Sequence, residues 1–492
     1  MDFLQEQLID PLSTILYTHV LIFVLIGVGI YFTLRTRFVQ IRYFGRMLHQ
    51  IRSSHGHSGG ISSFQAFCVG LASRVGIGNI AGVAIALTVG GPGAVFWMWV
   101  VAAVGMATAL IEATLAQIFK VRSKDGAFRG GPAFYIQRGL GSRPGGIVFA
   151  ILVVFTFGIA FTMVEANAIS DVLKTSHAVT AEWTALGLVA FAAPVLFGGI
   201  RRVAKVAGFV LPIVATGYVL LALVIVAVNI AHLPAVIAQI LGGAFGFKQL
   251  AGGFGGGITA AMLNGVKRGL FASEAGMGSA PHIAATATVS HPVEQGLIQS
   301  LAVFVDTMVV CTSTAFIVMV SGPDIYDPAR PAAIAGASLT QTAIAAGLGS
   351  WTTGVMTIVV FVFAFSAVLS NYVCAEANLF FLGAGRRAVA VLKVVTLVAV
   401  AVGALAKLAV VWSLADVGMA LVAVGNLIAI CLLGEWAFAA VRDFHRQSAA
   451  GQKPVFKTAE LPGVLDGDVW ELPRLRPLRR YGRTSPPATA VT

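Results

Sequence analysis

Two stretches of this chain are apolar enough to lie in lipid and yet are rich in glycine. Residues 64–90 contain the run GIGNIAG at 76–82, and residues 249–286 contain five glycines within 252–257 and two more at 276 and 278. Backbone at membrane depth leaves helix geometry only where protein or a watery cavity satisfies its polar groups. Paired glycine-interrupted segments in the two halves of a chain are therefore typical of a transporter's substrate site.

The first stretch offers backbone groups that suit a zwitterion and a cation. Unwinding around Gly76 and Gly78 would expose N–H groups at the start of a half-helix, whose positive dipole end favours a carboxylate. Carbonyls freed on the other side, that of Val75 among them, suit Na⁺, and Asn79 offers a donor and an acceptor. The predicted substrate-binding residues here are Gly76, Ile77, Gly78 and Asn79. Close helix packing through the same glycines is the alternative.

The second stretch is predicted to supply the opposite wall of the site. Gly256, Gly257 and Thr259 would let backbone approach a small ligand closely. Lys267 and Arg268 would place residues 274–279 near the cytoplasmic surface. These residues are therefore expected to form either an inner gate or a purely structural turn.

Ionisable residues at membrane depth are functional candidates by default. They are Arg74, Glu112, Glu165, Asp306 and Glu376. Arg74 needs a partner, and Glu112 or Glu274 is expected to pair with it, either as a gate or as a purely structural ion pair.

A second group of oxygen-bearing side chains suits a coupling cation. Asp306 is followed by Thr307, Thr312 and Ser313, and Ser366 lies in a later apolar segment. We expect Val75, Asp306, Thr307 and Ser366 to bind or couple the cation. An isolated serine such as Ser366 otherwise bonds the carbonyl of the preceding helical turn.

Composition places most of the chain in a membrane. Hydrophobic residues make up 57% and charged residues 11% of the 492 residues, whereas soluble domains average about a quarter charged residues. The four cysteines are widely spaced in apolar segments, which indicates neither a disulfide framework nor a metal site. Motifs of metalloproteases, serine hydrolases and P-loop enzymes are absent from the sequence, so we expect no enzyme and no cofactor other than a coupling ion.

About eleven apolar segments are long enough to cross a bilayer. They lie near residues 14–34, 64–90, 94–119, 147–170, 183–200, 206–229, 249–274, 294–320, 352–382, 388–406 and 411–434. With an outside N-terminus, most of the 33 Lys and Arg residues fall in inside loops, which is the positive-inside pattern. The net charge of +12 is thus explained by topology and not by nucleic-acid binding.

The segments divide into an extra helix and two halves. Residues 14–34 form the extra helix, and residues 64–229 and 249–434 hold five segments each, so the halves start on opposite sides of the membrane as an inverted repeat. Residues 1–442 would form the transmembrane domain. Residues 443–492, rich in Pro and Arg, are expected to be a cytoplasmic tail with little fixed structure.

Several of these runs together resemble the alanine or glycine:cation symporter family. They are residues 71–83 (LASRVGIGNIAGV), 90–99 (GGPGAVFWMW), 130–135 (GGPAFY), 266–271 (VKRGLF), 274–281 (EAGMGSAP) and 304–307 (FVDT). The resemblance covers residues 15 to 440. It implies an all-α, LeuT-type five-plus-five fold with one extra helix, and Na⁺- or H⁺-coupled uptake of small neutral amino acids across a bacterial inner membrane.

The resemblance also marks departures from the family's pattern. Ile77 stands where many members have Thr, and Glu165 stands where a Gln that contacts substrate is usual. Ser273 replaces a usual Asn, and Ser366 with Ala367 reduces a common pair of hydroxyls to one. A carboxylate at Glu165 would reject anions, hold the substrate amine or bind a proton.

The sequence therefore predicts a secondary active symporter that imports alanine or glycine with Na⁺ by alternating access. The substrate carboxylate would meet the amides near Gly78 and Asn79, and its amine would face Glu165. A proton-coupled carrier of another small amino acid is the nearest alternative, and a channel is a more distant one.

Overall fold

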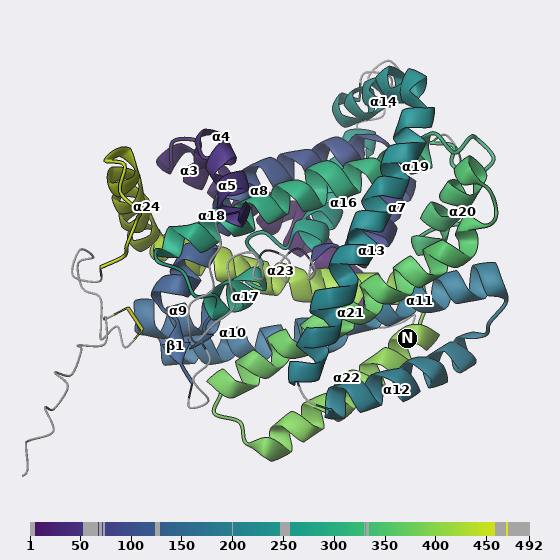
Figure 1. Cartoon of the computed structure of the whole chain (residues 1–492). Helices are drawn as coiled ribbons and strands as arrows, with labels where there is room; N and C mark the ends of the chain where they lie inside the picture. The colour runs from purple at the N-terminus through teal and green to yellow at the C-terminus, as the bar shows by residue number, and fades with distance from the viewer. Residues whose placement is uncertain are drawn as a thin grey trace, which may run out of the picture.

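The computed structural model is almost entirely helical (Figure 1). It describes residues 5–52, 67, 71, 74–123, 128–198, 200–246, 256–328, 330, 334–457 and 469–470. The strands in this part of the chain are β1 (Val121–Arg122) and β2 (Phe128–Arg129), which pair antiparallel with Val121 opposite Arg129.

The helices follow one another with short connections. In chain order they are η1 (Gln5–Ile9), α2 (Asp10–Ile15), η2 (Leu16–Leu21), α3 (Ile22–Arg35), α4 (Val39–Arg42), α5 (Phe44–Arg52), η3 (Gly78–Gly82), α7 (Val83–Gly90), α8 (Gly93–Ile118), α9 (Pro132–Gly139), α10 (Arg143–Phe155), η4 (Thr156–Phe161), α11 (Thr162–His177), α12 (Ala181–Phe197), α13 (Ile200–Val228), η5 (Ile230–His232), α14 (Leu233–Phe245), α16 (Gly256–Ser273), α17 (Ala280–Thr286), α18 (Pro292–Val303), η6 (Phe304–Cys311), α19 (Thr312–Met319), α20 (Ala337–Leu348), α21 (Thr352–Phe381), α22 (Arg386–Leu405), α23 (Leu408–Leu432) and α24 (Gly434–Ala449).

The lengths and apolarity of these helices define a polytopic membrane protein. Seven helical stretches of the described residues are long and apolar enough to cross a bilayer, or eight if the pair Ile213–Val228 and Ile230–Phe245, bent by 75°, is one span. Two of the other predicted segments appear as shorter apolar helices, Gly78–Gly90 and Ala181–Phe197.

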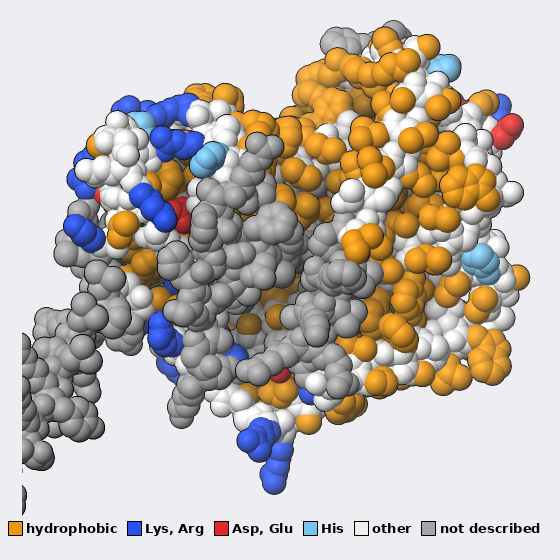
Figure 2. Space-filling view, in the orientation of Figure 1, with side chains coloured by type: hydrophobic (Ala, Val, Ile, Leu, Met, Phe, Trp, Pro, Cys, Tyr) orange, Lys and Arg blue, Asp and Glu red, His pale blue; other side chains and the backbone are white. Residues whose placement is uncertain are grey.

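The outer surface of the helices is apolar, as lipid contact requires. Phe23, Trp183 and Val228 are 67%, 69% and 70% exposed, and hydrophobic side chains cover much of the face shown in Figure 2. Because water would penalise so continuous an apolar surface, this surface is expected to face acyl chains.

Helix α8 lies at the centre of the fold, against α3, α16 and α18. A side chain on Gly105 of α8 would lie 2.9 Å from the Cβ of Ala275, and one on Gly296 of α18 would lie 2.5 Å from the Oγ1 of Thr114. Gly265 of α16 likewise approaches the backbone of Ala94 too closely for a side chain. These glycines therefore allow close helix packing, as small residues do in membrane interfaces.

The C-terminal segment has more structure than its composition predicts. The expected boundary at residue 443 falls inside α24, so residues 443–449 are helical. Further on, the amide of Phe456 donates to the carbonyl of Ser290 (3.0 Å), and Nε1 of Trp470 donates to the carbonyl of Gln117 (2.9 Å). The expectation of little fixed structure is thus wrong for 443–457, because α24 continues to Ala449 and the side chains of Phe444 and Phe456 are buried.

Candidate substrate and cation site

The first helix break lies at Val75 and Gly76. The amide of Val75 donates to the carbonyl of Leu71 (2.7 Å). The amide of Gly76 instead donates to the side-chain Oδ1 of Asn79 (3.1 Å), and the amide of Asn79 donates to the carbonyl of Gly76 (3.2 Å). The π-helix η3 then begins at Gly78. A side chain thus replaces a backbone acceptor at the break, which keeps buried polar groups satisfied.

Asn79 also ties this break to η6. Its Nδ2 donates to Oδ1 (2.7 Å) and to the carbonyl (3.1 Å) of Asp306. The hydroxyl of Thr307 donates to the other carboxylate oxygen of Asp306 (3.0 Å). All three side chains are fully buried. The structure therefore brings the predicted residues Asn79, Asp306 and Thr307 into one hydrogen-bonded group.

The second helix break lies between α16 and α17. Glu274, Gly276 and Gly278 have φ values of 52°, 84° and 89°. Glycine adopts this left-handed region without strain, whereas a residue with a Cβ adopts it at a cost. Residues 274–279 therefore form the break itself, because the left-handed backbone at three of them ends the α-helix.

Polar side chains from two distant helices hold the second break. Oε1 of Glu112 in α8 accepts the amide of Gly276 (3.2 Å). Asn426 of α23 donates to Oε2 of Glu112 (2.8 Å) and to the carbonyl of Gly276 (2.9 Å). Within the break, the hydroxyl of Ser279 donates to Oε2 of Glu274 (2.5 Å). Asn426 was not predicted, although a lone Asn in an apolar helix is a usable signal.

The helical residues that precede the two breaks contact each other directly. Nε of Arg74 donates to the carbonyl of Ser273 (2.9 Å) and Nη1 donates to Oε1 of Gln299 (2.8 Å). The predicted ion pair of Arg74 with Glu112 or Glu274 is wrong for the described residues: neither carboxylate is paired with it. Each carboxylate is engaged by donors of the second break instead.

Gly78 and Gly76 have different surroundings. A Cβ on Gly78 would lie 2.9 Å from Cδ1 of Phe271 and 3.2 Å from Cα of Ala272 in α16, so Gly78 is a packing position. A Cβ on Gly76 would meet nothing closer than 3.8 Å, and one of those atoms is Cβ of Ala367 in α21. Gly76 thus faces the part of α21 that carries the buried Ser366.

Glu165 lies in α11 with its side chain buried. Its Oε2 has no hydrogen-bond partner among the described residues. Phe161 precedes it by four positions, and residues four apart share a helix face. The ring of Phe161 packs on that of Phe271 with centroids 4.6 Å apart, three residues before the second break begins at Glu274. The unpaired carboxyl group therefore lies on the helix face that packs on the end of α16, next to the second break.

The structure does not bring Gly256, Gly257 and Thr259 to this place. They begin α16, and Thr259 is exposed. The other end of α16 is roughly 24 Å away at about 1.5 Å rise per residue. The prediction assumed that clustered glycines break a helix, whereas Gly256 and Gly257 belong to an unbroken one. The other glycines of this cluster, at 252, 253 and 255, lie outside the described residues.

A buried ion pair near the end of α16 was also not predicted from the sequence. Nη2 of Arg268 donates to both carboxylate oxygens of Asp416 in α23 (2.7 and 2.6 Å), and Nζ of Lys267 lies 3.4 Å from the same carboxylate. The guanidinium of Arg268 also lies 4.3 Å from the ring centroid of Trp412. Arg268 is only 3% exposed, and Asp416 neutralises its charge. That Lys267 and Arg268 lie near the cytoplasmic surface stays a prediction.

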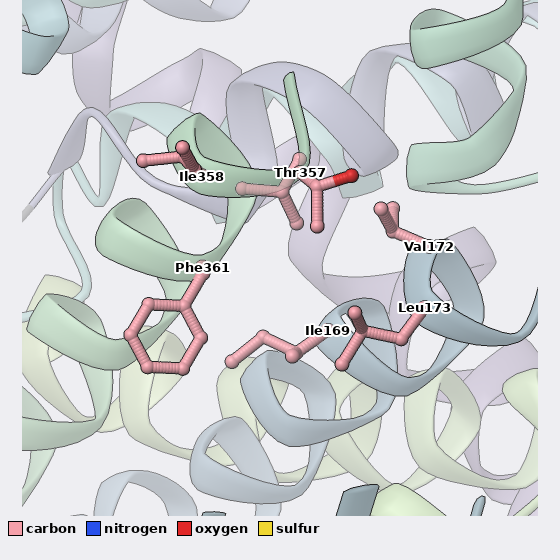
Figure 3. Close-up of a pocket in the computed structure, with 7 residues that line it drawn as sticks. Ile169, Val172, Leu173, Thr357, Ile358 and Phe361 are labelled. Atoms are coloured by element: carbon pink, nitrogen blue, oxygen red, sulfur yellow. The ribbon is translucent and has the colours of Figure 1, made fainter. Parts of the chain in front are cut away.

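A separate apolar pocket of about 170 Å³ lies between α11 and α21 (Figure 3). Ile169, Val172 and Leu173 line one side, and Ile358 and Phe361 line the other. The pocket is not lined by residues of either break, so it is distinct from the candidate site.

Apolar helices with two contacting breaks and buried polar groups define a membrane transporter rather than an enzyme. Comparison of the chain with known protein families agrees with this class, because the model of the sodium:alanine symporter family matches residues 1–458. The chain belongs to that family, which confirms the resemblance seen in the sequence.

Relatives similar to the chain carry transporter names. The amino-acid carrier protein AlsT of Bacillus subtilis is 44% identical over 92% of this chain and 95% of its own length. The probable sodium/glutamine symporter GlnT of the same organism is 43% identical over 92% and 93%. The sodium/alanine symporter AgcS of Methanococcus maripaludis is 36% identical over 88% and 95%.

Proposed function

We propose that the protein is a secondary active symporter that imports alanine or glycine together with Na⁺ by alternating access. The observation that carries the proposal is the direct contact of Arg74 with Ser273, the residues that immediately precede the two helix breaks. Discontinuous helices of this kind supply amide groups for anionic substrate groups and carbonyls for Na⁺. The names of AgcS and GlnT support Na⁺ coupling, and leave alanine and glutamine as candidate substrates.

The substrate carboxylate is proposed to meet the amides of Ile77 and Gly78. The amides of Gly76 and Asn79 already have acceptors within the break. The ammonium group is proposed to face the unpaired oxygen of Glu165, which would hold it as an ion pair.

The cation is proposed to lie on the other side of the first break. The carbonyl of Val75 and the hydroxyl of Ser366 are the proposed ligands, since Ala367, next to Ser366, faces Gly76. Asp306 and Thr307 would couple this site to η6 through Asn79.

The proposed topology follows the sequence. Residues 64–229 and 249–434 would be inverted repeats of five segments, each beginning with a broken helix, with residues 14–34 as an extra helix. The N-terminus would lie outside and residues 443–492 in the cytoplasm of a bacterial cell, as the distribution of Lys and Arg favours.

Uptake of radiolabelled alanine into proteoliposomes tests the proposal. Saturable uptake that requires an inward Na⁺ gradient, and that unlabelled glycine inhibits, is expected. Non-saturating flux that ignores the gradient would indicate a channel. Inhibition by glutamine but not by glycine would assign the larger substrate.

Proton coupling is a second candidate because of the unpaired carboxyl group of Glu165. If Glu165 binds the coupling proton, uptake driven by a pH gradient should be lost in Glu165→Gln. The matched control is Glu376→Gln, since Glu376 is a carboxylate of α21 that already accepts the hydroxyl of Tyr372 (3.0 Å). Equal pH dependence of uptake in the wild type and Glu165→Gln would exclude Glu165 from proton coupling.

A further inference from the structure

An apolar cleft opens on the surface of the protein beside α3, α4 and α5. Its volume is about 670 Å³, within the range of small-molecule sites. The lining side chains include Ile30, Leu34, Phe38, Ile41, Met106 and Phe304. The cleft thus runs from the apolar part of α3 to the turn that follows it, between α4 and α8.

The cleft also has a polar rim with an unsatisfied acceptor. Thr33 and Gln40 line it, and Nε2 of Gln40 donates to Oγ1 of Thr33 (3.0 Å). Oε1 of Gln40 is buried and has no partner among the described residues, while the whole residue is only 8% exposed. A buried carbonyl oxygen without a donor is unfavourable, so this oxygen marks a place where a ligand hydroxyl would bind.

The backbone at this rim is held in a strained turn. Arg37 and Phe38 are consecutive non-glycine residues with φ of 54° each. The amide of Phe38 donates to the carbonyl of Thr33 (2.8 Å), which closes the turn after α3. Such strain clusters at ligand clamps and switch regions. Here it places the half-exposed ring of Phe38 in the cleft, and the exposed Arg37 precedes Phe38 in the same turn.

The segment that borders the cleft, residues 35–52, is strongly basic. Residues 35–52 hold five arginines, and no Asp or Glu occurs between Asp10 and Glu112. Figure 2 shows Lys and Arg side chains gathered over α4 and α5. Arg35 pairs with Glu435 of α24. Arg37 and Arg42, which flank the cleft residues Phe38 and Ile41, form no ion pair in the described part of the chain.

We propose that this cleft binds one anionic diacyl phospholipid. An acyl chain would fill the space between α3 and α8, the phosphate would lie on Arg37 and Arg42, and a headgroup hydroxyl would donate to Oε1 of Gln40. Basic pockets beside membrane helices recognise anionic headgroups in this way. A soluble anion would leave the apolar cleft empty, and a second copy of the chain would bring these arginines against their own equivalents.

Native mass spectrometry of the detergent-purified protein tests this proposal. The probes are phosphatidylglycerol and phosphatidylcholine with identical acyl chains, added separately. Wild-type protein is expected to retain phosphatidylglycerol preferentially. The double variant Arg37→Gln/Arg42→Gln should bind it roughly 25-fold more weakly, at about 1 kcal/mol per basic residue. The matched control is Arg386→Gln/Arg387→Gln, which removes two exposed arginines at the start of α22.

A second variant tests the apolar part of the cleft without changing charge. Ala103 lines the cleft, so Ala103→Trp should fill it and reduce binding of both lipids, whereas Ala190→Trp on the exposed face of α12 should not. Unchanged melting temperatures would show that the variants fold. Equal retention of the two lipids by the wild type would overturn the proposal. So would a double variant that keeps the preference, or a lipid effect that follows dimer formation instead of the cleft residues.

Discussion

Neutralising Asp416 should destabilise the fold more than neutralising its partner Arg268. Both side chains are about 95% buried, and Arg268 donates to both oxygens of Asp416 at 2.7 and 2.6 Å. Asp416→Asn leaves the buried Arg268 and the partly buried Lys267 without this counter-charge. Removing one partner of a buried pair costs about 3–5 kcal/mol.

Arg268→Gln is a milder change because Asp416 keeps Lys267 at 3.4 Å. At an effective dielectric constant of about 20, that remaining attraction is about 5 kcal/mol before desolvation. We therefore expect Arg268→Gln to cost only about 1.5–3 kcal/mol, as for a hydrogen bond to a charged group.

The free energy of unfolding in detergent, measured by denaturant titration, decides between these values. The exposed Asp324 supplies the control, since Asp324→Asn should change stability by less than about 0.5 kcal/mol. The double variant should be more stable than the sum of the single losses predicts, by about 0.5–3 kcal/mol. An Arg268→Gln loss equal to or above that of Asp416→Asn would refute the role assigned to Lys267.

Three further substitutions probe the breaks. Gly78→Ala should destabilise the protein by about 1–3 kcal/mol, because the added Cβ would lie 2.9 Å from Cδ1 of Phe271. Gly76→Ala should leave stability unchanged, because the nearest atoms to its added Cβ are 3.8 Å away. Equal melting temperatures of the two variants would contradict this. Glu112→Ala should lower stability by about 1–3 kcal/mol, because the amide of Gly276 loses its acceptor. Increased protease cleavage at 274–279 would report that loss, and an unchanged digestion pattern would count against it.

Composition and local glycine pattern were sufficient to predict the class of protein and the first break. An apolar chain with few charges cannot fold as an ordinary soluble domain, so membrane embedding follows from the sequence alone. The bend at Gly76 was predictable too, because Asn79, the residue that satisfies its amide, lies only three positions away. Contacts between residues so close in the chain can be predicted from the sequence.

The second break shows what only the tertiary structure decided. Gly256 and Gly257 were expected to interrupt the second segment, but α16 begins at Gly256 and runs unbroken to Ser273, and its later glycines fit against α8. The break that the structure describes lies at Glu274–Gly278. Glycine permits both close packing and left-handed backbone, so its presence alone does not distinguish them. The partners of Glu112, Arg74 and Arg268 are likewise set by which helices pack together. Those pairings join residues far apart in the chain, so no local pattern in the sequence encodes them.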